Sequence, residues 1–293
     1  MDRPLLGIAL MAGFCLLAPL GDGLAKYAGA TIPVLLIVAS RFFAQAILLS
    51  PALRTRVPTR ILWRIGARAA LHVFAMGLLF VSLRYLPLAD AIAIAFVTPL
   101  LVLLFGHVFA GEEVGRTRLG ACILGFAGTL MVLQPNLAEA GLVALMPLGV
   151  AVCFAVFMLM TRSLTREIEA IPLQAVSGVM ASIVLLPVVL LSGLPVPSGP
   201  DLALLAGVGA LGTLAHLLMT WSLKFAPSAT LAPIQYLEIP VAVVVGALLF
   251  GDLPGPLASA GIAVTVAAGL MALRSERRIA AASRASDLRP PPV

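Results

Sequence analysis

Charged residues are scarce in this sequence. Only 11% of its 293 residues are Asp, Glu, Lys or Arg, whereas charged residues make up about 25% of ordinary soluble domains. Hydrophobic residues account for 61% of the chain, and its mean hydropathy is +1.11. So few polar side chains cannot cover the surface of a soluble globule. The composition therefore excludes a soluble enzyme or binding domain and indicates a membrane protein.

Cysteine and the short motifs of catalysis are also rare. The three cysteines, Cys15, Cys122 and Cys153, fall in separate apolar runs, which argues against a disulfide framework and a zinc site. The stretch GVGALG at 207–212 matches the dinucleotide motif G-x-G-x-x-G, but no strand precedes it, so it predicts close helix packing. The sequence contains no Walker loop with its lysine and no H-E-x-x-H or G-x-S-x-G motif. We expect no enzymatic activity, no metal, no cofactor and no direct use of ATP.

Long apolar runs, by contrast, fill most of the chain. A run of about 20 residues, at about 1.5 Å per residue, crosses the roughly 30 Å hydrocarbon layer of a bilayer. The first run could instead be a signal peptide, because Arg3 precedes it and AGA at 28–30 resembles a cleavage site; nine further runs favour a membrane helix. The sequence thus predicts an all-α integral membrane protein with ten transmembrane helices, at residues 5–24, 32–50, 66–84, 88–109, 117–134, 142–161, 172–192, 201–222, 229–250 and 255–273.

The basic residues lie almost entirely on one side of these predicted helices. The opposite side has only Lys26 and Arg84. Because Lys and Arg are in excess in cytoplasmic loops, we expect both termini in the cytoplasm of a bacterial-type inner membrane, and we do not expect nucleic-acid binding from the net charge of +6. Residues 274–293 should form a basic, disordered tail. The cytoplasmic side carries sixteen of the nineteen basic residues: Arg3, Arg54, Arg56, Arg60, Arg64, Arg68, Arg116, Arg118, Arg162, Arg166, Lys224, Arg274, Arg277, Arg278, Arg284 and Arg289.

The two halves of the chain repeat a motif. LRYLPLADAIAIAFVTPLLVLLFGHVFAGEE begins at Leu83, and LKFAPSATLAPIQYLEIPVAVVVGALLFGD begins at Leu223. Each copy has a basic residue, an aromatic residue and a proline, then an apolar run with a proline in its middle, then glycine and an acid. The spacing that follows is also shared: 21 and 8 residues separate Pro99, Gly120 and Gly128, and likewise Pro240, Gly261 and Gly269.

An odd number of helices in each copy makes the repeat inverted. Five helices per copy carry the second copy into the membrane with the opposite orientation. Inverted repeats of this kind are the architecture of many secondary transporters, because the halves can exchange conformations around one central site. We expect repeats at 1–136 and 137–273, followed by the tail at 274–293.

The motif pair and the glycine-bearing run after each copy resemble the EamA-type branch of the drug/metabolite transporter superfamily. The resemblance covers residues 5–273. It implies an inner-membrane carrier with a central cavity between its halves, and a substrate among amino acids, related metabolites, vitamins or nucleotide-like molecules. The motif is specific for the fold and weak for the substrate.

Two charged residues lie near the middle of predicted helices. Arg41 and Glu238 are each about ten residues from the start of their apolar run. A charge at the bilayer centre costs roughly 2.5–3.5 kcal/mol on insertion scales, so its presence favours a function. The two could flank the cavity and hold each other or the two ends of a zwitterion, or form a structural ion pair. Gln45, one turn after Arg41, shares its face and is a further candidate for substrate binding.

The run at 229–250 should be irregular in its middle. Pro233 and Pro240 each remove a helix hydrogen bond and free carbonyl groups, which a membrane tolerates only against protein or a wet cavity. We therefore expect Gln235 and Tyr236, between these prolines, to face the substrate site. Tyr236 and Trp221 could stack on a planar substrate, or Trp221 could anchor the helix at the membrane interface.

Other ionisable residues suggest gating or proton coupling. His72 is a candidate for this role, whereas His216 is a candidate for substrate binding; both lie in runs expected to face the cavity, although a single buried histidine is more often neutral and hydrogen-bonded. Asp22 and Asp90 lie near the outer helix ends, where helix-end contacts or a gate are expected. Glu238 could also bind a proton, because desolvation favours the neutral form of a carboxyl group.

These residues predict a secondary carrier for a small polar or zwitterionic metabolite, most simply an amino acid or derivative. An alternative is an importer of an aromatic vitamin or nucleoside-like compound such as riboflavin or S-adenosylmethionine. An alternative of another class is a non-transporting membrane sensor or assembly subunit. The expected partners are a small-molecule substrate and the lipid bilayer, and the glycine-bearing runs could also form a homodimer face.

Overall fold

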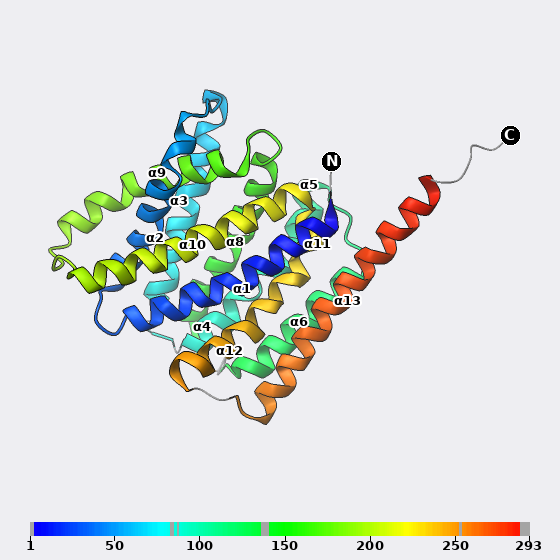
Figure 1. Ribbon diagram of the computed structural model, residues 1–293. Coiled ribbons are helices and arrows are strands. Elements are labelled where there is room, and N and C mark those ends of the chain that lie inside the picture. Colours follow the sequence, from blue (N-terminus) through cyan, green and yellow to red (C-terminus); the bar gives the residue numbers. More distant parts are fainter. Residues whose placement is uncertain (1–2, 83–84, 87, 136–140, 252–253, 288–293) are drawn as a thin grey trace.

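The protein is a bundle of packed helices (Figure 1). The structure, a computed structural model, describes residues 3–82, 85–86, 88–135, 141–251 and 254–287. For residues 80, 88–90, 279, 280 and 282–287 it describes the backbone alone.

The first half contributes six α-helices and a short 3-10 helix. They are α1 (Pro4–Ala28), α2 (Val34–Leu48), η1 (Ser50–Arg54), α3 (Thr59–Ser82), α4 (Leu88–Ala95), α5 (Thr98–Ala110) and α6 (Arg116–Leu133). The second half contains, in chain order, η2 (Gly141–Ala144), α8 (Leu145–Leu164), α9 (Ala170–Leu191), α10 (Gly199–Phe225), α11 (Ser228–Leu231), η3 (Ala232–Leu237), α12 (Glu238–Phe250) and α13 (Pro256–Asp287).

These helices make ten membrane crossings, as the sequence predicts. In the described part of the chain, nine segments are long and apolar enough to span a membrane, and the tenth, α2, is apolar but only 15 residues long. Pro33 caps the start of α2, and η1, with a proline in its first turn, follows its end. At about 22 Å, α2 is shorter than the hydrocarbon layer.

Two crossings are broken in the middle. In the first half, α4 ends at Ala95 and α5 begins at Thr98 with Pro99 in its first turn. In the second half, a 3-10 segment, η3, separates α11 from α12. Proline lacks the N–H of a continuous helix, and Pro233 in the first turn of η3 ends α11. The irregular backbone expected near Pro233 is therefore confirmed.

Helices of the two halves pack in pairs that an inverted repeat would produce. The first crossing, α1, packs on the eighth, α10. The pair that the repeat makes equivalent to it, the third crossing α3 and the sixth crossing α8, also packs together. The pairs α2 with α9 and α6 with α13 each join equivalent crossings of the two halves. Figure 1 shows α6 and α13 running side by side along one edge of the bundle.

Glycines permit this close packing. A Cβ atom on Gly128 of α6 would lie 2.9 Å from the Gly261 carbonyl oxygen of α13 and 2.7 Å from the Thr265 side chain, so the helix backbones meet directly. Within GVGALG, a Cβ on Gly209 would clash with Ala44 of α2. This stretch packs one helix on another, as the sequence predicts.

One expectation about the basic residues needs correction. Residues 274–287 continue α13 rather than forming a disordered tail; alanine and arginine are strong helix formers, and no proline interrupts them before residue 290. Arg68 and Arg162, assigned above to the cytoplasmic side, are buried. Arg162 donates to the carbonyl oxygens of Leu223 and Lys224 at 2.8 and 2.9 Å, near the end of α10.

Candidate functional site

A small cavity lies between helices of the two halves. Its volume is about 10 Å³, which leaves room for about one water molecule. A substrate can enter only when the surrounding side chains or helices separate, so this conformation is closed around its centre. The lining residues come from α2, α3 and α10: Arg41, Phe42, Gln45, His72, Met76, Gly212 and His216.

Two histidines face each other at this cavity. The ring centroids of His72 and His216 are 4.8 Å apart. We call them the imidazole pair. Phe42 and Phe157 lie 5.1 and 4.7 Å from the His72 ring, and Phe14 lies 6.0 Å from the His216 ring. Three of the residues that line the cavity, Phe42, His72 and His216, therefore carry flat rings, which can stack with an aromatic ligand.

Arg41 and two carboxylates, Asp22 and Glu238, lie together on one side of the cavity, which we call the Asp22 side. Arg41 forms an ion pair with Asp22 of α1. Their side chains are 19% and 55% exposed, so the rest of the protein does not fully enclose the pair. Glu238, the first residue of α12, interacts electrostatically with both of them. The partner of Arg41 is thus Asp22 rather than the expected Glu238; α1 packs against α12, which brings both carboxylates near one cation.

A hydrogen-bonded glutamine pair closes the opposite side. Gln45 Nε2 donates to the backbone oxygen and to the side-chain oxygen of Gln174 at 2.6 and 3.0 Å. Gln174 Nε2 in turn donates to Thr220 Oγ1 and to the His216 carbonyl oxygen at 2.6 and 3.0 Å. Both glutamines are buried. This glutamine bridge, Gln45 with Gln174, joins α2 of the first half to α9 of the second.

Two further layers lie beyond the glutamine bridge. The first is an apolar cluster, and the second is a set of polar contacts in which Arg60 and Arg64 of α3 pair with Glu167, and Arg64 also donates to Ser163. Both layers connect α3 of the first half to α8 and α9 of the second. The apolar cluster is built around Ile61, Ile65, Leu164 and Leu173.

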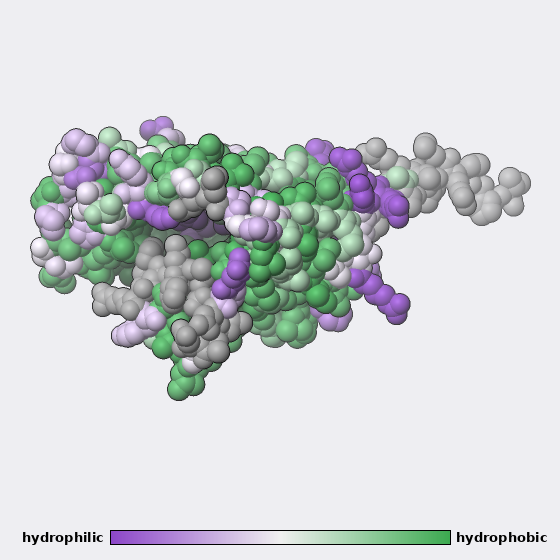
Figure 2. All heavy atoms as spheres, turned by 90° about the horizontal axis from the view of Figure 1, so that it is seen from below, coloured by the Kyte–Doolittle hydropathy of each residue, from purple (hydrophilic) through white to green (hydrophobic). Residues whose placement is uncertain are grey.

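The other face of the molecule is more open. Figure 2 views the bundle from below and shows a hollow with hydrophilic surface inside it. The last turns of α1, which carry Asp22, also lie toward this lower side (Figure 1). The central cavity is therefore sealed by three layers on the side of the glutamine bridge, while Asp22 on the other side is more than half exposed.

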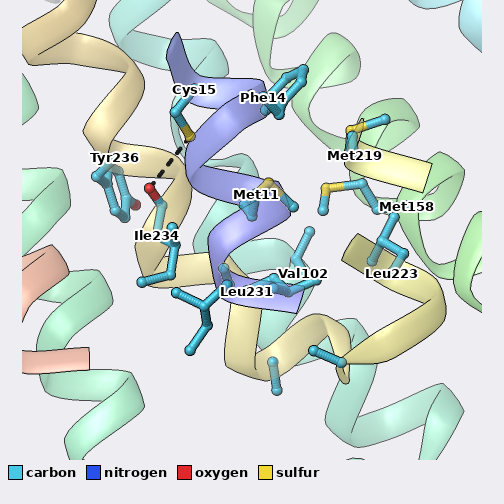
Figure 3. Close-up of a cluster of buried hydrophobic side chains, with 14 of the residues drawn as sticks. Met11, Phe14, Cys15, Val102, Met158, Met219, Leu223, Leu231, Ile234 and Tyr236 are labelled. Carbon is cyan, nitrogen blue, oxygen red and sulfur yellow. Dashed lines mark hydrogen bonds between the residues drawn. The ribbon is translucent and has the colours of Figure 1, made fainter. Parts of the chain in front are cut away.

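Tyr236 and Gln235 lie in the core rather than at the cavity. The Tyr236 ring packs directly on Gly125, and its hydroxyl donates to the Phe96 carbonyl oxygen at 3.3 Å. Cys15 donates to the Ile234 carbonyl oxygen at 3.5 Å, the contact drawn in Figure 3. These bonds satisfy carbonyl groups that the two broken crossings expose, so the side chains of Tyr236 and Cys15 support the irregular backbone. Gln235 is buried, and its Nε2 has no hydrogen-bond partner among the described residues.

The remaining predicted residues lie elsewhere. Trp221 lines a separate groove of about 350 Å³ together with Thr55, Glu169 and Pro172, on the far side of the glutamine bridge from the cavity. Asp90 belongs to α4, but its side chain lies outside the described residues. The structure thus brings together Arg41, Gln45, His72 and His216, with Asp22 and Glu238 beside them.

Arg68 was missed by the sequence analysis. It lies one turn before His72 on α3 and is 1% exposed. Its Nε donates to Thr161 Oγ1 at 2.6 Å and its Nη1 to Ser177 Oγ at 2.8 Å, while the guanidinium lies 4.2 Å from the centre of the Phe157 ring. Arg68 precedes His72 by four residues, so both lie on one face of the helix. This spacing is the sequence feature that could have identified Arg68.

Comparison with known proteins identifies the family. The EamA-like transporter family matches residues 5–134 and 141–274, one copy in each half. The chain belongs to this family. It is therefore a membrane transporter, not an enzyme, and its substrate is a small molecule.

Several bacterial relatives carry specific names. A riboflavin transporter of Rhizobium johnstonii is 31% identical over 231 residues, covering 78% of this chain and 74% of the relative. An S-adenosylmethionine uptake transporter of Rickettsia felis is 25% identical over 88% of both chains. A solved crystal structure with 19% identity superposes with a TM-score of 0.74 over 94% of this chain and 98% of its own, which supports the fold.

Proposed function

We propose that this transporter is a secondary carrier for a metabolite with an aromatic heterocycle, of the class of riboflavin or S-adenosylmethionine. The observation that carries the proposal is the imidazole pair set among phenylalanine rings at the small cavity between the two halves. Aromatic rings stack on such a surface and retain hydrogen bonds at their edges. The names of the two relatives support this class, and neither name favours the simple amino acid expected above.

The transport cycle follows from the closed geometry. A heterocycle cannot fit in the present cavity, so binding requires the helices on the Asp22 side to move apart. Release on the other side requires the glutamine bridge to open and the apolar and ion-pair layers to separate. Two inverted halves can exchange these conformations around one site. We assign this alternating access to the repeats at 1–136 and 137–273.

The cavity residues take distinct roles in this scheme. His72 and His216 stack on the ring, while Arg41 and Gln45 bind its polar edge. Glu238 and Asp22 compete for Arg41 and couple its release to proton or substrate binding. Tyr236 and Gln235 act indirectly, by fixing the broken crossing beside the site.

The basic residues orient this scheme in the membrane. Removing the buried Arg68 and Arg162 from the cytoplasmic set leaves a strong excess of basic residues on one side, so both termini lie in the cytoplasm of a bacterial inner membrane. Asp22 then faces outward and the glutamine bridge faces the cytoplasm. A reporter enzyme that is active only on the outer side of the inner membrane, fused after Val293, tests this orientation. Activity of this reporter contradicts it.

Uptake and binding by the purified carrier test the substrate class. The carrier is reconstituted into liposomes and supplied with radiolabelled riboflavin or S-adenosylmethionine, and ligand-induced thermal shifts are measured in parallel. We expect saturable uptake and a raised melting temperature with one of them, because a ligand of the folded state stabilises it. His216→Leu should abolish both effects.

His107 provides the matched control. It is the exposed third histidine, on α5, where its Nδ1 contacts the Glu112 carbonyl oxygen. His107→Leu should leave uptake and thermal shift unchanged. Stabilisation by simple amino acids but by neither heterocyclic compound contradicts the proposed class.

A further inference from the structure

Arg68 is a buried cation without a carboxylate partner. Its side chain is almost wholly inaccessible, and among the described residues no carboxylate forms an ion pair with it. A guanidinium stays charged in proteins. A buried charge is costly unless it is paired. The observed partners, two hydroxyl groups and the Phe157 ring, neutralise none of this charge.

One donor group of Arg68 has no partner at all. Its Nη2 is buried and makes no hydrogen bond to any described residue. The same is true of His216 Nδ1, which belongs to a residue that lines the cavity. Both residues with an unsatisfied polar atom lie beside the same aromatic ring, because Phe157 contacts the Arg68 guanidinium and both rings of the imidazole pair.

Packing alone does not account for this arrangement. A methionine in place of Arg68 would fill a similar volume and would bury no charge, and buried ionic groups can often be replaced by hydrophobic residues without loss of stability. Arg68 is not part of the ion-pair layer with Glu167 either, because Arg64 and Arg60, one and two turns earlier on α3, make those contacts. The unmet need of Arg68 is an oxygen acceptor, and the closed cavity next to it is the place where one can arrive.

We propose that Arg68 is a specificity-determining residue that donates from Nη2 to an oxygen of the bound substrate. This inference rests on the proposed function and deepens it. The substrate ring enters among the phenylalanines, Phe157 moves aside, and the acceptor oxygen reaches the guanidinium. The acceptor is a ring carbonyl in a flavin or the carboxylate in S-adenosylmethionine. A ligand that lacks an oxygen acceptor, or presents a cation at this end, is rejected.

The test compares each ligand with an analogue that lacks the acceptor. Equilibrium binding to the purified carrier is measured for riboflavin and its 2-thio and 4-thio analogues, each of which lacks one ring-carbonyl oxygen, and for S-adenosylmethionine and its decarboxylated form. We expect the carrier to prefer the complete ligand by roughly 10- to 100-fold, the value of a charge-assisted hydrogen bond. The pair that shows the preference tells which oxygen is bound.

Arg68→Met should remove that preference and leave the ligand-free melting temperature unchanged or raised. Arg64→Met is the matched control on the same helix, because it removes a surface ion pair; it should retain the preference. Arg68→Lys keeps the charge but loses the planar fork, so it should weaken selection of a ring carbonyl more than selection of a carboxylate. This variant decides the question if Arg68→Met does not fold.

The outcomes separate the two proposals. Binding by the wild-type carrier with a preference that persists in Arg68→Met and Arg68→Lys overturns the role of Arg68 and leaves the proposed function intact. If Arg68→Met does not fold, an intact ring-carbonyl preference in Arg68→Lys, or an intact carboxylate preference in the uncharged Arg68→Gln, assigns Arg68 to structure, which also overturns its role. A wild-type carrier that binds neither ligand pair overturns the proposed function and this inference together.

Discussion

Breaking the glutamine bridge should open the carrier on the side of the bridge, which is the proposed cytoplasmic side. Gln45→Leu removes both hydrogen bonds that cross from α2 to Gln174 and leaves the buried side-chain oxygen of Gln174 without its donor. Each lost bond is worth about 1 kcal/mol, and an unsatisfied buried acceptor costs about as much again. The closed state should therefore lose about 2–3 kcal/mol relative to the open one, and the open population should rise roughly 30- to 150-fold.

Thiol labelling of the buried apolar layer measures this opening. Ile65→Cys places a reporter at a wholly buried position, and Cys153→Ser removes the one native cysteine that is not fully buried. The labelling rate by a maleimide in the absence of substrate follows the population of the opened state when reclosing is fast. It should rise by the same factor as that population in Gln45→Leu.

Gln235 supplies the control for this experiment. It is equally buried, but its amide nitrogen has no hydrogen-bond partner among the described residues. Gln235→Leu should therefore leave the labelling rate of the reporter within about twofold of its parent. Equal labelling rates in Gln45→Leu and Gln235→Leu would refute the assignment of the glutamine bridge as a gate.

Three further substitutions test the supporting structure by thermal melting and ligand binding. Tyr236→Phe loses the bond to the Phe96 carbonyl but keeps its ring, so it should cost about 1 kcal/mol of stability with unchanged ligand affinity; a large loss of affinity at full stability would place Tyr236 in the site. Gly128→Leu should cost about 1–3 kcal/mol or more by overpacking α6 on α13, and wild-type stability would contradict the observed helix contact. Glu112→Ala removes an acceptor of three hydrogen bonds at the start of α11 and should cost about 1–2 kcal/mol, whereas exposed Glu113→Ala should cost little.

Membrane physics made the helices and their breaks predictable. A lipid environment requires about 20 apolar residues per crossing and satisfied backbone groups throughout, so composition and proline position indicate both the crossings and the irregular segment near Pro233. The repeat also predicts that the two halves are inverted, because each half has five crossings and an odd number reverses the orientation of the second half. The short α2 and the helical extension to Asp287 were less accessible, since helix ends depend on local turns and propensities.

Partners across the bundle were not predictable in the same way. Depth along a helix placed Arg41 and Glu238 at one level, but it contains no information about which helices are neighbours. Asp22 became the partner of Arg41 through the packing of α1. Likewise, His72 and His216 are far apart in the sequence and meet because α3 and α10 both pack against α8.

The side chains at the cavity do not follow the symmetry of the backbone. Val97 of the first repeat occupies roughly the position that Glu238 has in the second, and the described cavity takes Arg41, Gln45 and His72 from the first half but only Gly212 and His216 as its lining from the second. A symmetric frame lets the two halves exchange conformations, whereas unlike walls hold the two ends of a ligand by different chemistry. A heterocycle stacked on the imidazole pair would therefore keep one orientation while access changes from one side to the other. The unsatisfied donors are where this asymmetry is strongest, and disagreements between local rules and the fold are expected at functional sites.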